Sequence, residues 1–254
     1  MRYVRFERAG RDFFGTLEGE VVLPLKGAPW ESRELAGEAC PVREVRLLAP
    51  VRPGNIFCVG RNYRDHAREL GNELPTEPVI FLKGVNSLLD PGGVVRLPRW
   101  AGRVDYEGEL AVIIGKTCRN IPEKEAMEVI FGVTCLNDIT ARELQKTDSN
   151  LTRSKSFDTF CPIGPWIVDS REAEGRNIVT RLNGVVVQSA STDLMIFPVP
   201  RIISHISRFA TLRPGDVIAT GTPAGVGPLK DGDRIEVELE GVGKLENSCV
   251  EERF

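Results

Sequence analysis

The stretch at residues 105–115, DYEGELAVIIG, combines three alternating carboxylates with a continuous apolar run. Alternate side chains of a β-strand share a face, so we expect Asp105, Glu107 and Glu109 to point to one side. Three carboxylates on a strand that enters the core are costly unless a cation, protons or water offset their charge. Oxygen ligands without a neighbouring His or Cys suit Mg2+, Mn2+ or Ca2+ better than zinc. The alternative is a solvated face of an exposed edge strand, and this stretch alone does not decide between them.

A second polar group, NDITARELQ, follows a buried strand predicted at residues 131–136. Asp138 is expected where this strand becomes a helix, and Arg142 and Gln145 follow four and seven residues later on the same helical face. A carboxylate, a guanidinium and an amide aligned at the end of a strand are typical of a binding site. A capping aspartate with a surface ion pair is the alternative.

The segment GRNYRDHARELG, residues 60–71, predicts a short helix over residues 63–70 with Asn62 as its cap. This helix places His66 at the border of its apolar stripe and Glu69 one turn later, within reach of His66. Glycines at both ends and prolines after the segment are typical of a mobile lid. An ordinary surface helix with a His–Glu pair is the alternative.

Two lysines and a glycine-rich loop are further candidates. Lys155 lies among apolar residues in SKSFDTFCPIGPW and therefore needs a partner or a function, unless it extends outward from a loop. Lys83 ends the strand EPVIFLK, and a strand-end lysine that reaches solvent is the simpler interpretation. The loop TGTPAGVG, residues 220–227, can hold an anion with its backbone N–H groups and the hydroxyls of Thr220 and Thr222, or it is a plain tight turn.

The remaining pattern consists mostly of strands. Residues 1–26 alternate between short strands and turns, and Asn-Gly within residues 178–187 predicts a hairpin with a type I′ turn. An amphipathic helix is predicted over residues 198–210, with Phe209 in its inward stripe and His205 at the edge as a structural residue. We therefore predict a small β-rich segment at residues 1–49 and a catalytic domain at residues 50–254.

Composition excludes several classes of protein. The chain has 254 residues, of which 41% are hydrophobic and 27% charged, as in ordinary globular proteins. A net charge of −3 gives no reason to expect nucleic acid or an anionic membrane as partner, and no apolar run approaches the roughly 18 residues of a membrane span. The N-terminus lacks the apolar segment of a secretion signal, and the six cysteines form no Cys-x-x-Cys pair, so we expect reduced, mostly buried thiols and a cytoplasmic location. Two histidines are too few for a His-rich metal site.

Seven motifs, in unbroken order over residues 55–239, resemble those of the fumarylacetoacetate hydrolase (FAH) superfamily. They are VGRNYRDHARE, EPVIFLK, DYEGELAVIIG, NDITARELQ, SKSFDTFCPIGP, STDLMIFPVPRIISHIS and LRPGDVIATGTPAGVG. The chain is most similar to compact FAH-domain enzymes such as acylpyruvate hydrolase/oxaloacetate decarboxylase and the bacterial homoprotocatechuate-pathway isomerase/decarboxylase. The resemblance implies an α+β, β-rich fold: a mixed β-sheet roll with few short helices and a small N-terminal β-rich segment, usually homodimeric.

The resemblance also implies roles for individual residues. Three carboxylates would hold Mg2+ or Mn2+: Glu107, Glu109 and Asp138. A catalytic group would include a His–Glu pair on a lid helix that orders over the substrate, together with a lysine: His66, Glu69 and Lys155. Four residues match positions that bind substrate in the family: Lys155, Arg142, Gln145 and Thr222. Asp105 is not a direct ligand in the family pattern, so we expect it to support the ligands from behind.

These roles imply a divalent-metal-dependent enzyme that acts on small 2-oxo or 2-hydroxy-dienoic dicarboxylic acids through a metal-stabilised enolate. The favoured activity is 2-hydroxyhepta-2,4-diene-1,7-dioate isomerase, 5-oxopent-3-ene-1,2,5-tricarboxylate decarboxylase, or both, in the catabolism of aromatic compounds. Acylpyruvate hydrolase/oxaloacetate decarboxylase is the alternative. A sugar-acid dehydratase and a non-catalytic binding protein are weaker alternatives.

Overall fold

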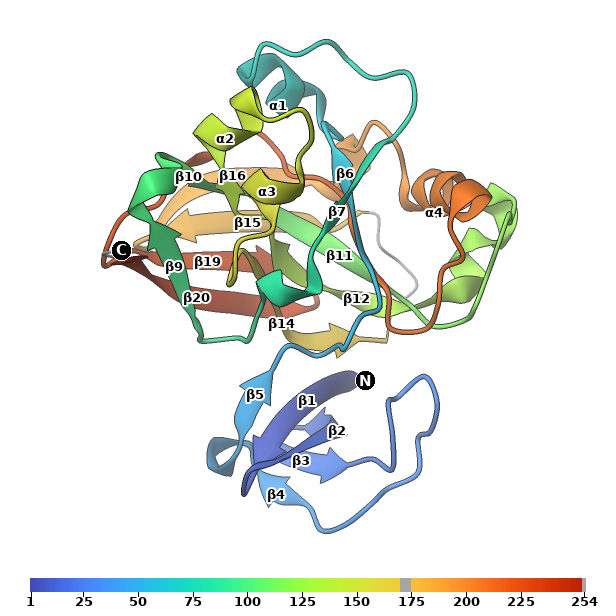
Figure 1. The fold of residues 1–254 in the computed structure, drawn as a ribbon. Coiled ribbons are helices and arrows are strands. Elements are labelled where there is room, and N and C mark those ends of the chain that lie inside the picture. The colour runs from blue at the N-terminus through green and yellow to red at the C-terminus, as the bar shows by residue number, and fades with distance from the viewer. Residues whose placement is uncertain (170–174, 253–254) are drawn as a thin grey trace.

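The computed structural model describes residues 1–169 and 175–252, and the strands in these ranges form three sheets (Figure 1). The largest sheet has the order β4-β3-β2-β1-β14-β12-β11-β17-β6-β7, with β5 on β1 and β8 on β14. Its strands are β1 Arg2–Arg8, β2 Arg11–Glu18, β3 Val21–Pro24, β4 Cys40–Pro41, β5 Arg46–Leu48, β6 Ile56–Gly60, β7 Val79–Lys83, β8 Leu88–Leu89, β11 Gly108–Ile114, β12 Ile130–Asn137, β14 Cys161–Val168 and β17 Val217–Ala219.

The two smaller sheets have the orders β13-β10-β18 and β16-β15-β19-β20-β9. Their strands are β9 Val94–Pro98, β10 Val104–Tyr106, β13 Thr140–Ala141, β15 Asn177–Leu182, β16 Val185–Ser191, β18 Gly227–Pro228, β19 Arg234–Leu239 and β20 Gly243–Glu252. The described α-helices are α1 Arg64–Glu69, α2 Arg142–Thr147, α3 Thr152–Lys155 and α4 Val199–Phe209. Short 3-10 helices occupy Val42–Glu44, Val85–Ser87, Arg99–Ala101, Glu123–Val129 and Thr192–Leu194. The predicted α+β, β-rich fold with few short helices is confirmed.

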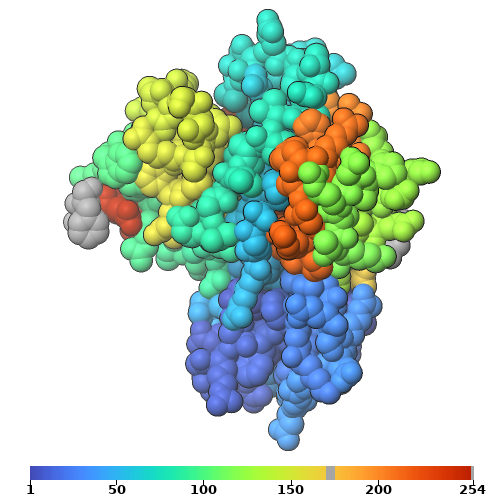
Figure 2. All heavy atoms as spheres, turned by 45° about the vertical axis from the view of Figure 1, so that its right-hand side comes forward, coloured from blue at the N-terminus to red at the C-terminus, as the bar shows by residue number. Residues whose placement is uncertain are grey.

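The N-terminal strands form a lobe of their own in outline, drawn in blue in Figures 1 and 2. The strands predicted within residues 1–26 are present as β1, β2 and β3. Strand β1 also pairs with β14, with Arg2 opposite Val168 and Tyr3 opposite Ile167, so the lobe continues the large sheet. A division near residue 49 remains a prediction.

Strand β11 lies at the centre of the large sheet, between β12 and β17. Leu110, Val112 and Ile114 pack in one hydrophobic cluster, which includes the inner face of α4. Ala111 and Ile113 belong to a second cluster on the other face of the sheet. Because both faces are covered, the strand has a continuous apolar run instead of an alternating pattern.

The hairpin and the long helix follow the sequence pattern with one exception. Leu182 lies opposite Val185, and Asn183 and Gly184 have φ angles of 52° and 80°, as a type I′ turn requires. Helix α4 is present, but Phe209 is 57% exposed, so the prediction that it faces inward was wrong. Phe209 is the last residue of α4 and does not belong to the hydrophobic cluster that the inner face of α4 joins.

All six cysteines are buried and free, as predicted. None of the described helices combines the length and the apolar character that crossing a membrane requires.

Candidate metal centre and active site

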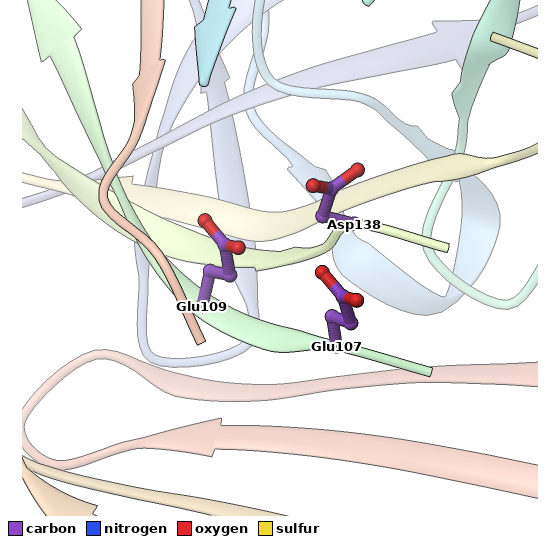
Figure 3. Close-up of side chains that lie close together, drawn as sticks. All are labelled: Glu107, Glu109 and Asp138. Carbon is purple, nitrogen blue, oxygen red and sulfur yellow. The ribbon is translucent and has the colours of Figure 1, made fainter. Parts of the chain in front are cut away.

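Three carboxylates meet where β11 and β12 lie side by side. One oxygen each from Glu107, Glu109 and Asp138 lies within 4.8 Å of the others, and Figure 3 shows the three groups converging. The backbone N–H of Asp138 donates to the Glu107 carbonyl at 2.8 Å, which extends the β11–β12 ladder and sets the carboxylates next to each other. The residues are only 4%, 2% and 1% exposed, so the alternative of a solvated edge strand was wrong.

Gly108, which lies between Glu107 and Glu109, packs directly against strand β15. A Cβ at Gly108 would lie 2.1 Å from Thr180 Oγ1, so only glycine allows β15 to approach this closely. The Glu107 N–H donates to Asn137 Oδ1 at 2.8 Å, and the Gly108 N–H donates to Gln188 Oε1 at 3.0 Å. Side-chain acceptors thus continue the hydrogen bonding across the break between β10 and β11.

Lys155 and Arg142 contact the carboxylates directly. Lys155 Nζ lies 2.7 Å from Glu107 Oε2 and 2.6 Å from Asp138 Oδ2. Arg142 Nη2 lies 2.6 Å from Glu107 Oε1, and its Nε lies 2.9 Å from Asp105 Oδ2. Lys155 is therefore buried, and the alternative that it extends outward was wrong. Asp105 holds Arg142 against the cluster, which is compatible with the supporting role expected for it.

The predicted single helical face for Asp138, Arg142 and Gln145 was wrong. Strand β13 follows Asp138 and pairs with β10, so the helix begins only at Arg142. Arg142 and Gln145 do lie one turn apart on α2, and Arg142 Nη1 donates to Gln145 Oε1 at 2.5 Å. Asp138 reaches the same site through the β-ladder instead.

Lys83 is a third cation of the cluster, and its predicted exposure to solvent was wrong. Its side chain is 0% exposed, and Nζ lies 2.7 Å from Asp138 Oδ1. It also donates to the backbone carbonyls of Ile139, at 3.3 Å, and of Lys155. Strand alternation contained a signal for this: Val79, Phe81 and Lys83 share a face, and the first two line the cavity described below.

The two glutamates differ in their charge environment. Burial by itself raises the pKa of Glu107, but Lys155 and Arg142 outweigh burial and hold that pKa well below its usual range. Burial, followed by the charge of Asp138, raises the pKa of Glu109 well above its usual value. Within the described part of the chain, no cationic side chain forms an ion pair with Glu109.

The loop at residues 220–227 binds carboxylates of the protein itself. The Gly221 N–H donates to Glu109 Oε2 at 2.8 Å, and the Gly225 N–H donates to the two oxygens of Glu69 at 3.0 and 3.2 Å. Gly221 has a φ of 100°, and a Cβ there would lie 2.7 Å from Asn62, so glycine is required. Glu69 Oε2 in turn lies 3.3 Å from His66 Nδ1, which links the loop to α1.

Asn62 holds the segment before α1 in place, and its predicted role as helix cap was wrong. Its side chain accepts from the Phe197 N–H at 2.8 Å and donates to the carbonyls of Phe197 and Thr220 at 3.0 and 2.7 Å. Tyr63 occupies the cap position, without a side-chain cap, and α1 begins at Arg64. The Thr220 hydroxyl donates to a backbone carbonyl at 2.9 Å, so it is committed to the fold.

A cavity of about 350 Å³ lies over the acidic cluster, and residues of α1, α2 and α3 contribute to its lining. Eight of the nine predicted site residues line it: His66, Glu107, Glu109, Asp138, Arg142, Gln145, Lys155 and Thr222. Glu69, the ninth, contacts His66 from outside the lining. The other polar lining residues are Arg61, Asn72 and Lys146, and the apolar part consists of Val59, Leu70, Val79, Phe81 and Leu151, with Gly60 between. The sequence interpretation did not single out Arg61 or Lys146.

Comparison with known proteins identifies the family. Residues 55–250 match the family described as "Fumarylacetoacetate (FAA) hydrolase C-terminal", and residues 1–50 match the one described as "Rv2993c-like, N-terminal". The chain belongs to the fumarylacetoacetate hydrolase family. The predicted resemblance is therefore confirmed.

Several named relatives are similar over most of their length. Oxaloacetate tautomerase YisK of Bacillus subtilis is 41% identical over 238 residues, which are 87% of this chain and 79% of that protein. Human mitochondrial oxaloacetate tautomerase FAHD2A is 43% identical over 223 residues, or 83% of this chain and 71% of that protein. The crystal structure of 2-hydroxyhepta-2,4-diene-1,7-dioate isomerase from Mycobacterium marinum aligns with a TM-score of 0.92 and 40% identity, covering 100% of both chains.

In this FAH-family chain the acidic cluster fits a hard divalent cation. Its three carboxylates offer only oxygen ligands, which suits Mg2+ or Mn2+. Glu109 is a buried acid that forms no ion pair in the described ranges, and a bound cation would supply one. With all carboxyls ionised, as in the metal-bound state, the buried groups of the cluster leave one negative charge in excess: Asp105, Glu107, Glu109 and Asp138 against Lys83, Arg142 and Lys155.

Proposed function

We propose that this FAH-family chain is a Mg2+- or Mn2+-dependent enzyme that isomerises a 2-oxo acid by moving a proton between carbon and oxygen. The observation that carries the proposal is the buried cluster of Glu107, Glu109 and Asp138 in the wall of a cavity that His66 also lines. A divalent cation held by these carboxylates would polarise the 2-oxo group and stabilise negative charge on its oxygen.

The chain's own residues supply binding and proton transfer. Arg142 and Lys155 line the cavity, and their positive charge favours the entry of an anionic acid beside three carboxylates. His66 is 4% exposed, and its Nδ1 faces Glu69, so the ring can exchange a proton with the ligand through Nε2. Glu69, fixed by the Gly225 N–H, sets the orientation of that ring.

Two proton-shifting reactions are the first candidates. Oxaloacetate tautomerisation is supported by the names of two relatives, and isomerisation of 2-hydroxyhepta-2,4-diene-1,7-dioate by that of the M. marinum enzyme. Both move a proton and leave the carbon skeleton intact. Decarboxylation of 5-oxopent-3-ene-1,2,5-tricarboxylate and hydrolysis of acylpyruvates require C–C cleavage in addition. A homodimer in the cytoplasm remains a prediction.

The test follows the enol absorbance of oxaloacetate and the diene absorbance of the hepta-dienedioate with Mg2+-loaded and EDTA-treated protein. We expect metal-dependent isomerisation of at least one of them, and its loss in Glu107→Gln and Asp138→Asn. Release of CO2, or cleavage of acetylpyruvate, without isomerisation would instead support the decarboxylase or hydrolase alternative. No turnover of any of these acids by metal-loaded protein would contradict the proposal.

A further inference from the structure

Two cations in the lining of the site cavity are not used by the acidic cluster. Arg61 and Lys146 both line the cavity, and within the described ranges neither forms an ion pair or a side-chain hydrogen bond. Arg142 and Lys155, in contrast, are held by carboxylates at 2.6–2.9 Å. Positive charge therefore remains available on Arg61 and Lys146 for an anionic group of a ligand.

Arg61 is placed by a backbone that is fixed on both sides. Its φ is 58°, in the left-handed region that residues other than glycine seldom adopt. Strand β6 ends at Gly60, which lies opposite Val79 in the sheet, and the side chain of Asn62 is hydrogen-bonded three times. The backbone of the half-buried Arg61 is therefore held in place at the cavity. Ordering of this side chain on ligand binding costs less conformational entropy than ordering of an arginine in a mobile loop.

The charge of the cavity favours a ligand with two negative groups. With all carboxyls ionised, the buried cluster has one negative charge in excess, and the lining residues Arg61 and Lys146 change this to one positive charge in excess. A divalent cation at the carboxylates raises this excess to three. A 2-oxo monocarboxylate neutralises one of these charges, whereas a dicarboxylate neutralises two.

We infer that Arg61, assisted by Lys146, binds the second carboxylate of the substrate and so selects 2-oxo dicarboxylates over 2-oxo monocarboxylates. The inference rests on the proposed function, because that function places the first carboxylate and the 2-oxo group at the metal centre. A guanidinium suits this task because it offers paired N–H donors to a carboxylate. The apolar residues Leu70, Val79 and Phe81 line the same cavity and suit the carbon chain of the substrate.

The kinetic test compares tautomerisation of oxaloacetate with that of acetylpyruvate, which has a methyl ketone where oxaloacetate has its second carboxylate. A charge-assisted hydrogen bond predicts that Arg61→Met lowers kcat/KM for oxaloacetate roughly 10- to 100-fold, mainly through KM. For acetylpyruvate we expect a change of less than about threefold, and partial recovery with oxaloacetate in Arg61→Lys. The matched control is Arg64→Met, which removes an exposed arginine three residues away that does not line the cavity, and it should leave both values unchanged.

A binding measurement separates this inference from the proposed function. Calorimetric titration of Mg2+-loaded protein with 2-oxoglutarate and 2-oxopentanoate compares a carboxylate with a methyl group at the same carbon and requires no turnover. We expect tighter binding of 2-oxoglutarate by the unmodified protein and loss of that preference in Arg61→Met. Such a preference without turnover of any tested acid would contradict the proposed reaction alone. Equal affinity for the pair, or equal losses for oxaloacetate and acetylpyruvate in Arg61→Met, would overturn the inference.

Discussion

The replacement of Lys83 by methionine removes a buried positive charge and leaves its partner in place. Lys83 Nζ lies 2.7 Å from Asp138 Oδ1, and the two side chains are 0% and 2% exposed. Removal of one partner of such a buried pair costs about 3–5 kcal/mol, whereas an exposed pair is worth about 0–1 kcal/mol. Asp138 keeps Lys155 at 2.6 Å, so we expect Lys83→Met to lower the free energy of unfolding by about 3 kcal/mol, the lower end of that range.

A divalent cation at the acidic cluster changes this expectation in a defined direction. The cation brings positive charge close to Asp138 and so compensates part of what Lys83 supplied. Mg2+ should therefore stabilise Lys83→Met by more than it stabilises the unmodified protein. A lysine with a merely structural role would lower stability equally with and without Mg2+.

The assay is urea unfolding followed by circular dichroism, once in EDTA and once in saturating Mg2+. Lys116→Met is the matched control, since Lys116 is exposed and forms no ion pair in the described part of the chain, and it should change stability by less than about 0.5 kcal/mol. A loss below about 1 kcal/mol in Lys83→Met, comparable to that of an exposed pair, would refute the buried ion pair.

Three further predictions concern the backbone, the metal and the histidine. Gly108→Ala places a methyl group 2.1 Å from Thr180 Oγ1, and calorimetric unfolding should show a loss of about 1–3 kcal/mol or more. The raised pKa of Glu109 means that Mg2+ displaces a proton, so Mg2+ affinity should rise with pH through that pKa, and titration in buffers of different ionisation enthalpy should detect proton release. In the metal-free protein, the folded state keeps a proton on Glu109 at pH values where the unfolded state has lost it. The free energy of unfolding should therefore fall as pH rises from the ordinary pKa of a glutamate toward the raised pKa of Glu109 in the folded state. Glu69→Gln should lower kcat roughly 10-fold or more while Mg2+ affinity stays unchanged, because Glu69 contacts His66 and not the three carboxylates; weaker Mg2+ binding would contradict this separation.

The sequence allowed prediction of those parts of the fold and site that depend on local periodicity. The apolar run of β11 and the Asn-Gly hairpin were identified because alternation and turn chemistry act over a few residues. The grouping of Glu107, Glu109 and Asp138 required the family resemblance, since the pairing of β11 with β12 cannot be read from either strand alone.

The errors in prediction arose where tertiary contacts override local preference. Asn62 is a residue type that often caps helices. Its side-chain amide instead donates to the backbone carbonyls of Phe197 and Thr220, which belong to distant segments of the chain. Lys83 was assigned to solvent because a lysine at a strand end ordinarily reaches water, while its partner Asp138 lies 55 residues further along the chain. Arg61 has no local signal of function, because the cavity that it lines is assembled from distant segments.

The metal centre is tested most directly by a crystal of the protein that is soaked with Mn2+ and oxalate and measured for the anomalous scattering of manganese. The proposed metal site predicts one strong anomalous peak bounded by the carboxylates of Glu107, Glu109 and Asp138, with oxalate on its cavity side. A manganese peak elsewhere in the molecule, with no scattering at the three carboxylates, would contradict it.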